Sequence, residues 1–194
     1  YAIAERAYQR ALNYARERTQ GRAVGGTHGE RVSIIAHPDV ARMLLDMKSR
    51  IEAMRAVSLY TAAAMDRSLR HPDEVERARG KRSVDVLIPI VKGWSSEVGN
   101  WVTSCALQVH GGMGFIEETG AAQHCRDARI TTIYEGTTGI QAADLVGRKL
   151  VRDGGQMATE LIEQMDTEIA QITEKFGDPV AQISAAVSAS LKLL

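Results

Sequence analysis

The chain has 194 residues, 44% of them hydrophobic, which is enough for one large domain or for one domain with an appendage. Its 24 basic and 24 acidic residues cancel, so no overall field attracts nucleic acid or an anionic membrane, and binding has to depend on a local site. Cys105 and Cys125 are too few for a disulfide-rich secreted domain and favour a reduced, cytoplasmic protein.

The first predicted element is a helix over about residues 1–18, rich in Ala, Arg and Glu and ended by Gln20-Gly21. Tyr1 is not an initiator methionine and opens within this helical pattern, so we expect a piece of a longer chain. No signal peptide and no membrane-spanning apolar run is evident in the sequence. A glycine-containing loop over residues 21–36 leads to Pro38, which suits a first helical position.

Two long segments then repeat apolar residues at steps of three and four, which predicts two amphipathic helices. The first stripe comprises Val40, Leu44, Met47, Ile51, Met54, Ser58, Ala62, Met65 and Leu69. The second comprises Val84, Leu87, Val91, Trp94, Val98, Val102, Cys105 and Val109. The charged stretch 71–82 between them is interpreted as a solvated connection, and Pro89 should kink the second helix.

Two long helices joined by a polar loop are expected to pack antiparallel. With the first helix and another over about residues 139–150, they predict an all-α fold, a four-helix up-down bundle. The Gly154-Gly155 pair breaks the pattern, so we expect a bundle domain over residues 1–152. Residues 153–194 should form an additional, truncated helical extension with its own apolar stripe.

One carboxylate lies where a catalytic base is commonly held. Glu135 follows the β-prone residues 130–134 and precedes Thr137 and Thr138, which are good N-cap residues for the next helix. Backbone N–H groups and the positive end of the helix dipole can bind polarised oxygen atoms there. The alternative interpretation is a solvated loop acid or a cap for a neighbouring helix.

A second signal is the glycine-rich stretch 108–115, Gln-Val-His-Gly-Gly-Met-Gly-Phe, at the end of the second long helix. Its N–H groups can cradle a phosphate, although glycine is also the commonest helix stop. Arg18 has a similar pair of interpretations. Its guanidinium can clamp a phosphate, or it can satisfy carbonyls at the end of the first helix.

Four motifs, taken together in their order along the chain, favour the functional interpretations of Glu135, Arg18 and the glycine-rich stretch over the structural ones. The set comprises Tyr14 to Arg22, Gln108 to Phe115, Arg126 to Ile130, and Ile133-Tyr134-Glu135-Gly136-Thr137. Together they resemble the C-terminal helical domain of acyl-CoA dehydrogenases over about residues 1–150. The form of residues 18–21, the glycine-rich loop and the added C-terminal helices look more like the bacterial branch that includes 3-methylmercaptopropionyl-CoA dehydrogenases.

The resemblance implies an FAD-dependent oxidation of an acyl-CoA thioester to the trans-2-enoyl-CoA. Glu135 would remove the α-proton while the β-hydride passes to the flavin, in an apolar pocket that raises the pKa of the base. Gly136 would let the backbone come close to the substrate. The resemblance also places side chains on the cofactor: Arg18 on its pyrophosphate, Thr137 near its flavin, and Gln108, Gly111 and Gly112 along its adenine side.

The resemblance further implies a homodimer or homotetramer and electron-transfer flavoprotein as the acceptor. The family's N-terminal helical domain and middle β-domain have no counterpart in these residues, so we expect the isolated fragment to be inactive. We expect no metal site and no nucleic-acid contact. The competing interpretation is a non-catalytic helical oligomerisation module, or a relative of the alkylation-response flavoproteins that bind DNA.

Overall fold

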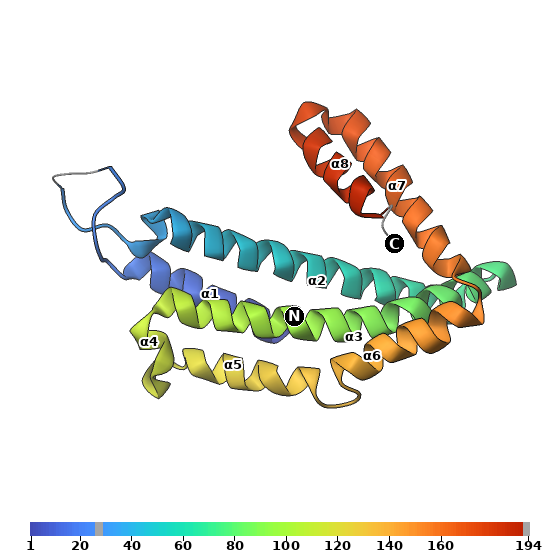
Figure 1. Ribbon diagram of the computed structural model, residues 1–194, viewed down its shortest axis with the longest axis horizontal. Helices are drawn as coiled ribbons and strands as arrows, with labels where there is room; N and C mark the ends of the chain where they lie inside the picture. Colours follow the sequence, from blue (N-terminus) through green and yellow to red (C-terminus); the bar gives the residue numbers. More distant parts are fainter. Residues whose placement is uncertain (26–28, 192–194) are drawn as a thin grey trace. The chain divides into compact units, whose positions relative to one another are not determined.

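The computed structural model describes residues 1–25 and 29–191. The described residues form helices and no strand, and an isolated bridge joins Thr19 and Ser33. The chain divides into two compact units, Tyr1–Asp144 and Leu145–Leu194 (Figure 1). The all-α prediction is therefore confirmed.

Unit 1 is an up-down helical bundle. Its main helices are α1 (Ala2–Glu17), α2 (Pro38–Arg70), α3 (Glu74–His110), α5 (Ala121–Arg129) and α6 (Thr138–Asp144). Figure 1 shows α1, α2 and α3 side by side, with α5 and α6 following one another along α3. Short helical segments complete the unit: η1 (Ile34–Ala36), α4 (Gly112–Phe115), η2 (Glu117–Thr119) and η3 (Ile130–Thr132).

Side-chain pairs fix the directions of these helices. The guanidinium of Arg55 on α2 lies 2.8 Å from the carboxylate of Glu5 on α1, while Lys48 lies over the ring of Tyr8, so α1 and α2 run antiparallel. The guanidinium of Arg50 lies 4.2 Å from the ring centroid of Trp101 on α3, and Arg50 belongs to the half of α2 that is remote from the connection to α3. Helices α2 and α3 are therefore also antiparallel, as predicted.

The core of unit 1 lies between α1, α2 and α3. The buried residues of α1 are all alanines, which allow the other two helices to approach it closely, and α2 and α3 contribute larger buried side chains. The buried members are Ala4, Ala7, Ala11, Ala15, Leu44, Met47, Ile51, Met54, Val98, Val102, Ala106 and Val109, together with Ile34 of η1.

Beyond Met54 the predicted stripe on α2 is wrong. Met65 and Leu69 are exposed, whereas Thr61 and Ala64 are buried. The reason is a close approach to α3, because a Cβ atom placed on Gly80 would lie 2.8 Å from the backbone nitrogen of Ser68. Small residues, rather than the most apolar ones, therefore face the partner helix here.

The predicted connection over residues 71–82 is also wrong, since only residues 71–73 link the two long helices. Asp73 caps α3 by accepting a hydrogen bond from the Val75 N–H at 2.8 Å. Glu74 and Glu76 lie in the first turn, where their negative charges interact favourably with the positive end of the helix dipole. The charged residues therefore form the start of α3 rather than a loop.

Unit 2 contains a π-helical segment, η4 (Leu145–Leu150), followed by α7 (Gln156–Phe176) and α8 (Asp178–Leu191), which pack against each other. The helix predicted over residues 139–150 is thus α-helical only as far as Asp144. The domain boundary expected after Arg152 stays a prediction. None of the described helices combines the length and the apolar character needed to cross a membrane.

Candidate active site

The segment before Glu135 is a helical turn rather than the extended stretch that its β-prone residues suggest. The hydroxyl of Thr131 donates to the Ala128 carbonyl at 2.6 Å, and that of Thr132 donates to the Arg129 carbonyl at 3.1 Å. These threonines satisfy carbonyls at the end of α5, which favours the 3-10 turn η3 over a strand.

Glu135 then adopts a φ of 53° and is the one non-glycine residue with a positive φ among the described residues. Gly136 follows with a φ of 90°. A left-handed backbone is disfavoured for a residue with a Cβ atom, and residues held in this way cluster at functional sites. The turn therefore presents Glu135 at the cost of local backbone strain.

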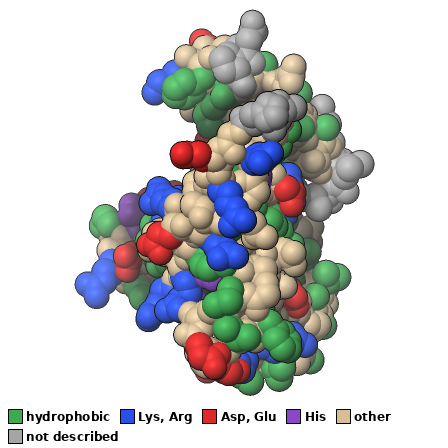
Figure 2. All heavy atoms as spheres, turned by 90° about the vertical axis from the view of Figure 1, so that its left-hand side faces the viewer, with side chains coloured by type: hydrophobic (Ala, Val, Ile, Leu, Met, Phe, Trp, Pro, Cys, Tyr) green, Lys and Arg blue, Asp and Glu red, His purple; other side chains and the backbone are tan. Residues whose placement is uncertain are grey.

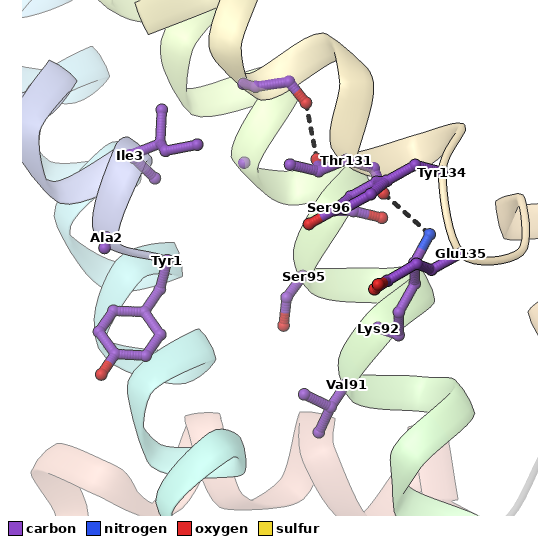
Figure 3. Close-up of a pocket in the computed structure, with 13 residues that line it drawn as sticks. Tyr1, Ala2, Ile3, Val91, Lys92, Ser95, Ser96, Thr131, Tyr134 and Glu135 are labelled. Carbon is purple, nitrogen blue, oxygen red and sulfur yellow. Dashed lines mark hydrogen bonds between the residues drawn. The ribbon is translucent and has the colours of Figure 1, made fainter.

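This turn forms one wall of a groove of about 330 Å³. The first residues of α1 form another wall, and α3 lies between them (Figure 3). The lining residues include Ile3, Ala4, Val91, Lys92, Ser95, Ser96, Gly99, Tyr134 and Glu135. The Glu135 side chain is exposed, and in Figure 3 its carboxylate points into the groove.

Polar side chains of α3 hold the loop between α5 and α6. The Asn100 amide donates to the Ala128 carbonyl at 3.0 Å, where the loop begins. The Lys92 ammonium donates to the carbonyls of Thr131 at 2.8 Å and Gly136 at 2.6 Å. Every anchor comes from one rigid helix, so the position of the turn relative to the groove is well defined.

The exit of the turn is capped as predicted. The Thr137 hydroxyl accepts a hydrogen bond from the Ile140 N–H at 3.3 Å, at the start of α6.

The Glu135 N–H forms no hydrogen bond with another described residue, so it remains available to an oxygen atom of a ligand. A Cβ atom on Gly136 would lie 2.8 Å from the Gln141 amide nitrogen, so the backbone there is close to its neighbours.

Arg18 lies at the other end of α1, where its N–H donates to the Tyr14 carbonyl and ends the helix. Its guanidinium forms no hydrogen bond or ion pair with any residue that the structure describes. A groove of about 400 Å³ lies beside it, and the described residues that line it include Arg18, Arg22 and Arg31 and none that is acidic. Figure 2 faces this end of unit 1 and shows several Lys and Arg side chains there, with Asp and Glu side chains among them.

The glycine-rich stretch ends α3 beside this region. Gln108 is exposed, and Gly111, with a φ of 58°, has open space where a Cβ atom would be, as does Gly112. His110 is buried and stacks on Tyr14 with ring centroids 4.5 Å apart. Burial lowers the pKa of His110, and the Ala106 carbonyl that it contacts opposes this.

The predicted site residues therefore fall into two groups. Glu135, Gly136 and Thr137 lie together at the groove near the start of α1, whereas Arg18 and the glycine-rich stretch lie near the ends of α1 and α3. Helix α1 has 16 residues, so the two groups are separated by roughly 24 Å. Among the described residues, no three His, Cys, Asp or Glu side chains come together as a metal site.

Sequence reasoning missed the residues of α3 that hold the turn, namely Lys92 and Asn100, and also Ser95 in the groove. The Ser95 hydroxyl oxygen is buried and finds no hydrogen-bond partner among the described residues. A usable signal was present, because Lys92 interrupts an apolar run between Val91 and Gly93. A charged residue within a buried stripe needs a partner.

Comparison with known proteins gives a family match. The model of the acyl-CoA dehydrogenase C-terminal domain matches residues 1–150. The chain is 47% identical to the 3-methylmercaptopropionyl-CoA dehydrogenase of Ruegeria pomeroyi, covering 98% of this chain and 33% of that protein. It is 40% identical to the broad-specificity linear acyl-CoA dehydrogenase FadE5 of Mycobacterium tuberculosis, covering 76% and 25%.

Among solved structures, butyryl-CoA dehydrogenase from Megasphaera elsdenii matches with a TM-score of 0.58 and 32% identity. That match covers 76% of this chain and 33% of the solved chain. The chain thus spans a third or less of the length of each of these relatives.

Proposed function

Because the chain belongs to the acyl-CoA dehydrogenase family, we propose that it is the domain that supplies the catalytic base for α,β-dehydrogenation of an acyl-CoA thioester. Glu135 is the base, and the product is the trans-2-enoyl-CoA. The observation that carries this proposal is the left-handed turn that directs Glu135 into the groove between α1 and α3.

In this reaction a carboxylate oxygen of Glu135 accepts the proton from the α-carbon of the thioester. That proton becomes more acidic when the thioester carbonyl accepts hydrogen bonds. The Glu135 N–H, unpaired within the described chain, is suited to be one such donor. An N–H donor of this kind is worth on the order of 3 kcal/mol in the transition state.

The groove favours a thioester with an apolar acyl chain. Ile3, Ala4 and Val91 line it with hydrocarbon, while Glu135 and Ser95 are among its polar groups. A mostly apolar site with a few placed polar groups is typical of small-molecule binding. An acyl chain bound in the groove would exclude water from the Glu135 carboxylate, which suits its task as a base.

The residues at the other end of α1 fit FAD. Arg18 has a guanidinium that can pair bidentately with a pyrophosphate, in a groove whose described lining holds no acidic residue. Gly111 and Gly112 leave open space beside their backbone, where Gln108 is also exposed, so an adenine can approach. Thr137 would contact the flavin at the Glu135 turn. FAD supplies, when bound, the acceptor for the β-hydride.

The separation of the two groups of residues suits a cofactor site shared between copies of the protein. We propose a homodimer or homotetramer in which Arg18 and the glycine-rich stretch hold FAD at a subunit interface. Electron-transfer flavoprotein is the acceptor, and the protein is cytoplasmic. The competing function, a helical oligomerisation module without catalysis, would make no use of the Glu135 carboxylate.

The test is Glu135→Gln in the holoprotein that contains this chain. The substitution keeps the size of the side chain and removes its basicity, so kcat should fall by about 10²- to 10⁴-fold while FAD is retained. Glu163→Gln, at an exposed position of α7, is the matched control and should behave as the parent. Turnover of Glu135→Gln within about threefold of the control would favour the non-catalytic module.

A further inference from the structure

Lys92 joins the two sides of the turn that carries Glu135. Its ammonium donates to the carbonyl of Thr131, four residues before Glu135, and to that of Gly136, immediately after it. The two distances, 2.8 and 2.6 Å, are those of strong charge-assisted hydrogen bonds. One side chain therefore closes the loop from the direction of α3.

The turn has few other restraints between these two carbonyls. The N–H groups of Ile133 and Tyr134 both bond to the Ile130 carbonyl, which fixes the start of the loop. The Gln141 amide reaches the Glu135 carbonyl only at 3.4 Å. The two short bonds from Lys92 join the carbonyls on either side of Glu135 and so help to hold its disfavoured φ of 53°.

The surroundings of Lys92 explain why a lysine serves here. The ammonium lies 5.7 Å from the centroid of the Tyr134 ring, so it also contacts the residue before Glu135. Lysine offers three donors on a flexible stem, which is enough for two carbonyls and a ring face. Methionine has a similar length and no donor, so it can fill the space without holding the turn.

We propose that Lys92 is a positioning residue that fixes the Glu135 carboxylate relative to the substrate, an inference that rests on the proposed role of Glu135. Lys92 does not exchange a proton in the reaction. It acts through the backbone of the turn, so its loss displaces the base, whereas Arg18, the glycine-rich stretch and the apolar residues of the groove keep their positions and hold most of the cofactor and the acyl chain. A displacement of about 1 Å can lower a rate by about 100-fold.

The experiment compares Lys92→Met, Lys92→Arg and Lys92→Ala in the holoprotein, using a saturated acyl-CoA as substrate. Lys81→Met and Lys81→Ala are matched controls, because Lys81 is exposed on the same helix. Each variant is measured for FAD content, kcat, KM and exchange of the substrate α-proton with solvent deuterium. The last readout reports on the base itself and would not respond to a merely structural role.

For Lys92→Met we expect kcat and the exchange rate to fall together, by about 10- to 100-fold, with KM and FAD content within about threefold of the parent. Lys92→Arg keeps donors and should retain at least a third of the parental kcat. Propylammonium added to Lys92→Ala should restore part of kcat without changing FAD content, and should not affect Lys81→Ala. This rescue decides the question if Lys92→Met does not fold.

A kcat of Lys92→Met within threefold of the parent would overturn the proposal. So would an arginine variant that folds but is no more active than the methionine variant, or an amine rescue that restores only FAD content. Glu135→Gln measured in parallel separates the two proposals. Full turnover of Glu135→Gln removes the proposed function, whereas an inactive Glu135→Gln beside a fully active Lys92→Met removes only the role of Lys92.

Discussion

The hydroxyl of Thr138 donates a hydrogen bond to the Glu97 carboxylate at 2.6 Å, which fastens the first residue of α6 to α3. Thr137, one residue earlier, caps α6 through its own hydroxyl. The exit of the Glu135 turn is thus fixed both within α6 and across to α3. Because these bonds lie two and three residues after Glu135, they should affect the geometry of the proposed base.

Thr138→Val tests this relationship, since valine keeps the shape of threonine and lacks the hydroxyl. We expect a loss of about 1 kcal/mol of stability and a several-fold lower kcat at unchanged FAD content. Thr138→Ser keeps the donor and should stay near the parent in both measurements. Equal behaviour of the valine and serine variants in urea unfolding and turnover would show that the bond to Glu97 has no such role.

Arg18→Ala should weaken FAD binding without affecting the bundle, because the guanidinium forms no bond with another described residue. A charge-assisted bond to a phosphate is worth about 1.5–3 kcal/mol, so affinity for FAD should fall by roughly 10- to 100-fold. Arg16→Ala, at an exposed position one half-turn earlier on α1, is the control. Flavin content after dialysis measures the difference, and equal retention by both variants would remove Arg18 from the site.

The sequence predicts the bundle well because its strongest signals are long and periodic. Helix α2 was expected over the residues where it lies, and Thr137 was expected as a cap. The errors fall where a tertiary contact outweighs a local tendency. Thr131 and Thr132 have side chains that favour strands, yet their hydroxyls bond to carbonyls of α5 and stabilise a helical turn.

The sequence was sufficient to predict Glu135 as the candidate base, but it did not predict the residues of α3 that hold its turn. Glu135 stands out because glycine and cap residues follow it in the chain, which is local information. Lys92 and Asn100 are 43 and 35 residues away in sequence, and only the packing of α3 against the loop brings them to it. No periodicity in a single sequence encodes such a contact, because it depends on which helix lies beside which.

Gly80→Ala should destabilise unit 1, because the added methyl group would meet the backbone of α2. A Cβ atom there would lie 2.8 Å from the Ser68 nitrogen and 2.9 Å from the Ala64 carbonyl oxygen, and backbone atoms cannot give way cheaply. We expect a loss of about 1–3 kcal/mol. Gly99→Ala on the same helix has open space and should gain up to about 1 kcal/mol. The urea midpoint of each variant, at an unchanged m-value, measures its change in stability. Equal midpoint shifts for the two variants would disprove the close approach at Gly80.

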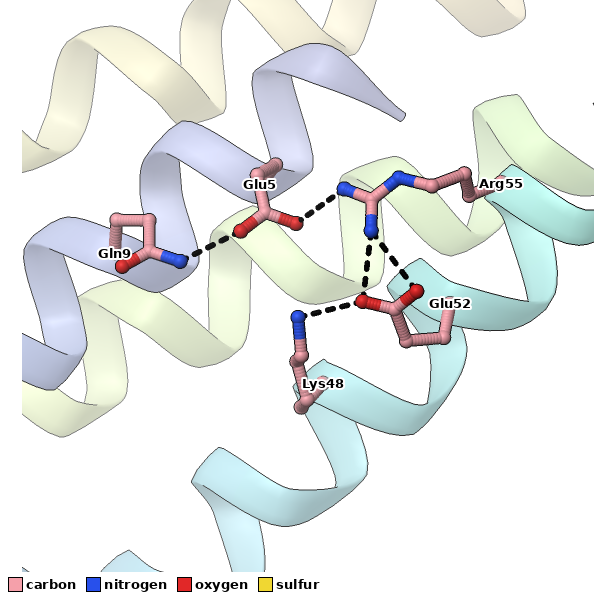
Figure 4. A network of polar contacts seen from close by, with 5 residues as sticks. All are labelled: Glu5, Gln9, Lys48, Glu52 and Arg55. Atoms are coloured by element: carbon pink, nitrogen blue, oxygen red, sulfur yellow. Dashed lines mark hydrogen bonds and ion pairs between the residues drawn. The ribbon is translucent and has the colours of Figure 1, made fainter.

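The lowered pKa of Glu5 predicts that part of the free energy of unfolding depends on pH in the acid range. A hydrogen bond from the Gln9 amide, and then the Arg55 guanidinium, lower the pKa of Glu5, while partial burial opposes them (Figure 4). A carboxyl group whose pKa is lowered in the folded state stabilises that state fully at a pH above its pKa in the unfolded chain, about 4.3. This stabilisation is lost as the pH falls through the pKa that the group has in the folded state.

Glu5→Gln should therefore destabilise the protein at pH 7 by no more than about 1 kcal/mol, and the difference from the parent should shrink on acidification below about pH 4. Gln9→Met removes the largest cause of the shift and should reduce the acid-dependent loss. Unfolding free energies measured between pH 3 and 7 test both variants. A Glu5→Gln effect that is constant over this range would contradict the lowered pKa.

Ser95 allows stability and function to be separated in the groove itself. Its hydroxyl oxygen is buried without a hydrogen-bond partner among the described residues, although it lines the same groove as Glu135. A buried hydroxyl without a partner is unfavourable, and alanine is the better helix former, so Ser95→Ala should stabilise the unliganded protein by about 0.5–1 kcal/mol.

If the hydroxyl serves the substrate, the same substitution should weaken acyl-CoA binding by about fivefold, since a neutral hydrogen bond is worth about 1 kcal/mol. Ser68→Ala is the control, because that hydroxyl already donates to the Met65 carbonyl and is remote from the groove. Thermal unfolding and acyl-CoA titration are measured on the same samples. A gain in stability with unchanged affinity would leave Ser95 as an unpaired structural residue, whereas opposite changes in the two quantities would assign it to substrate binding.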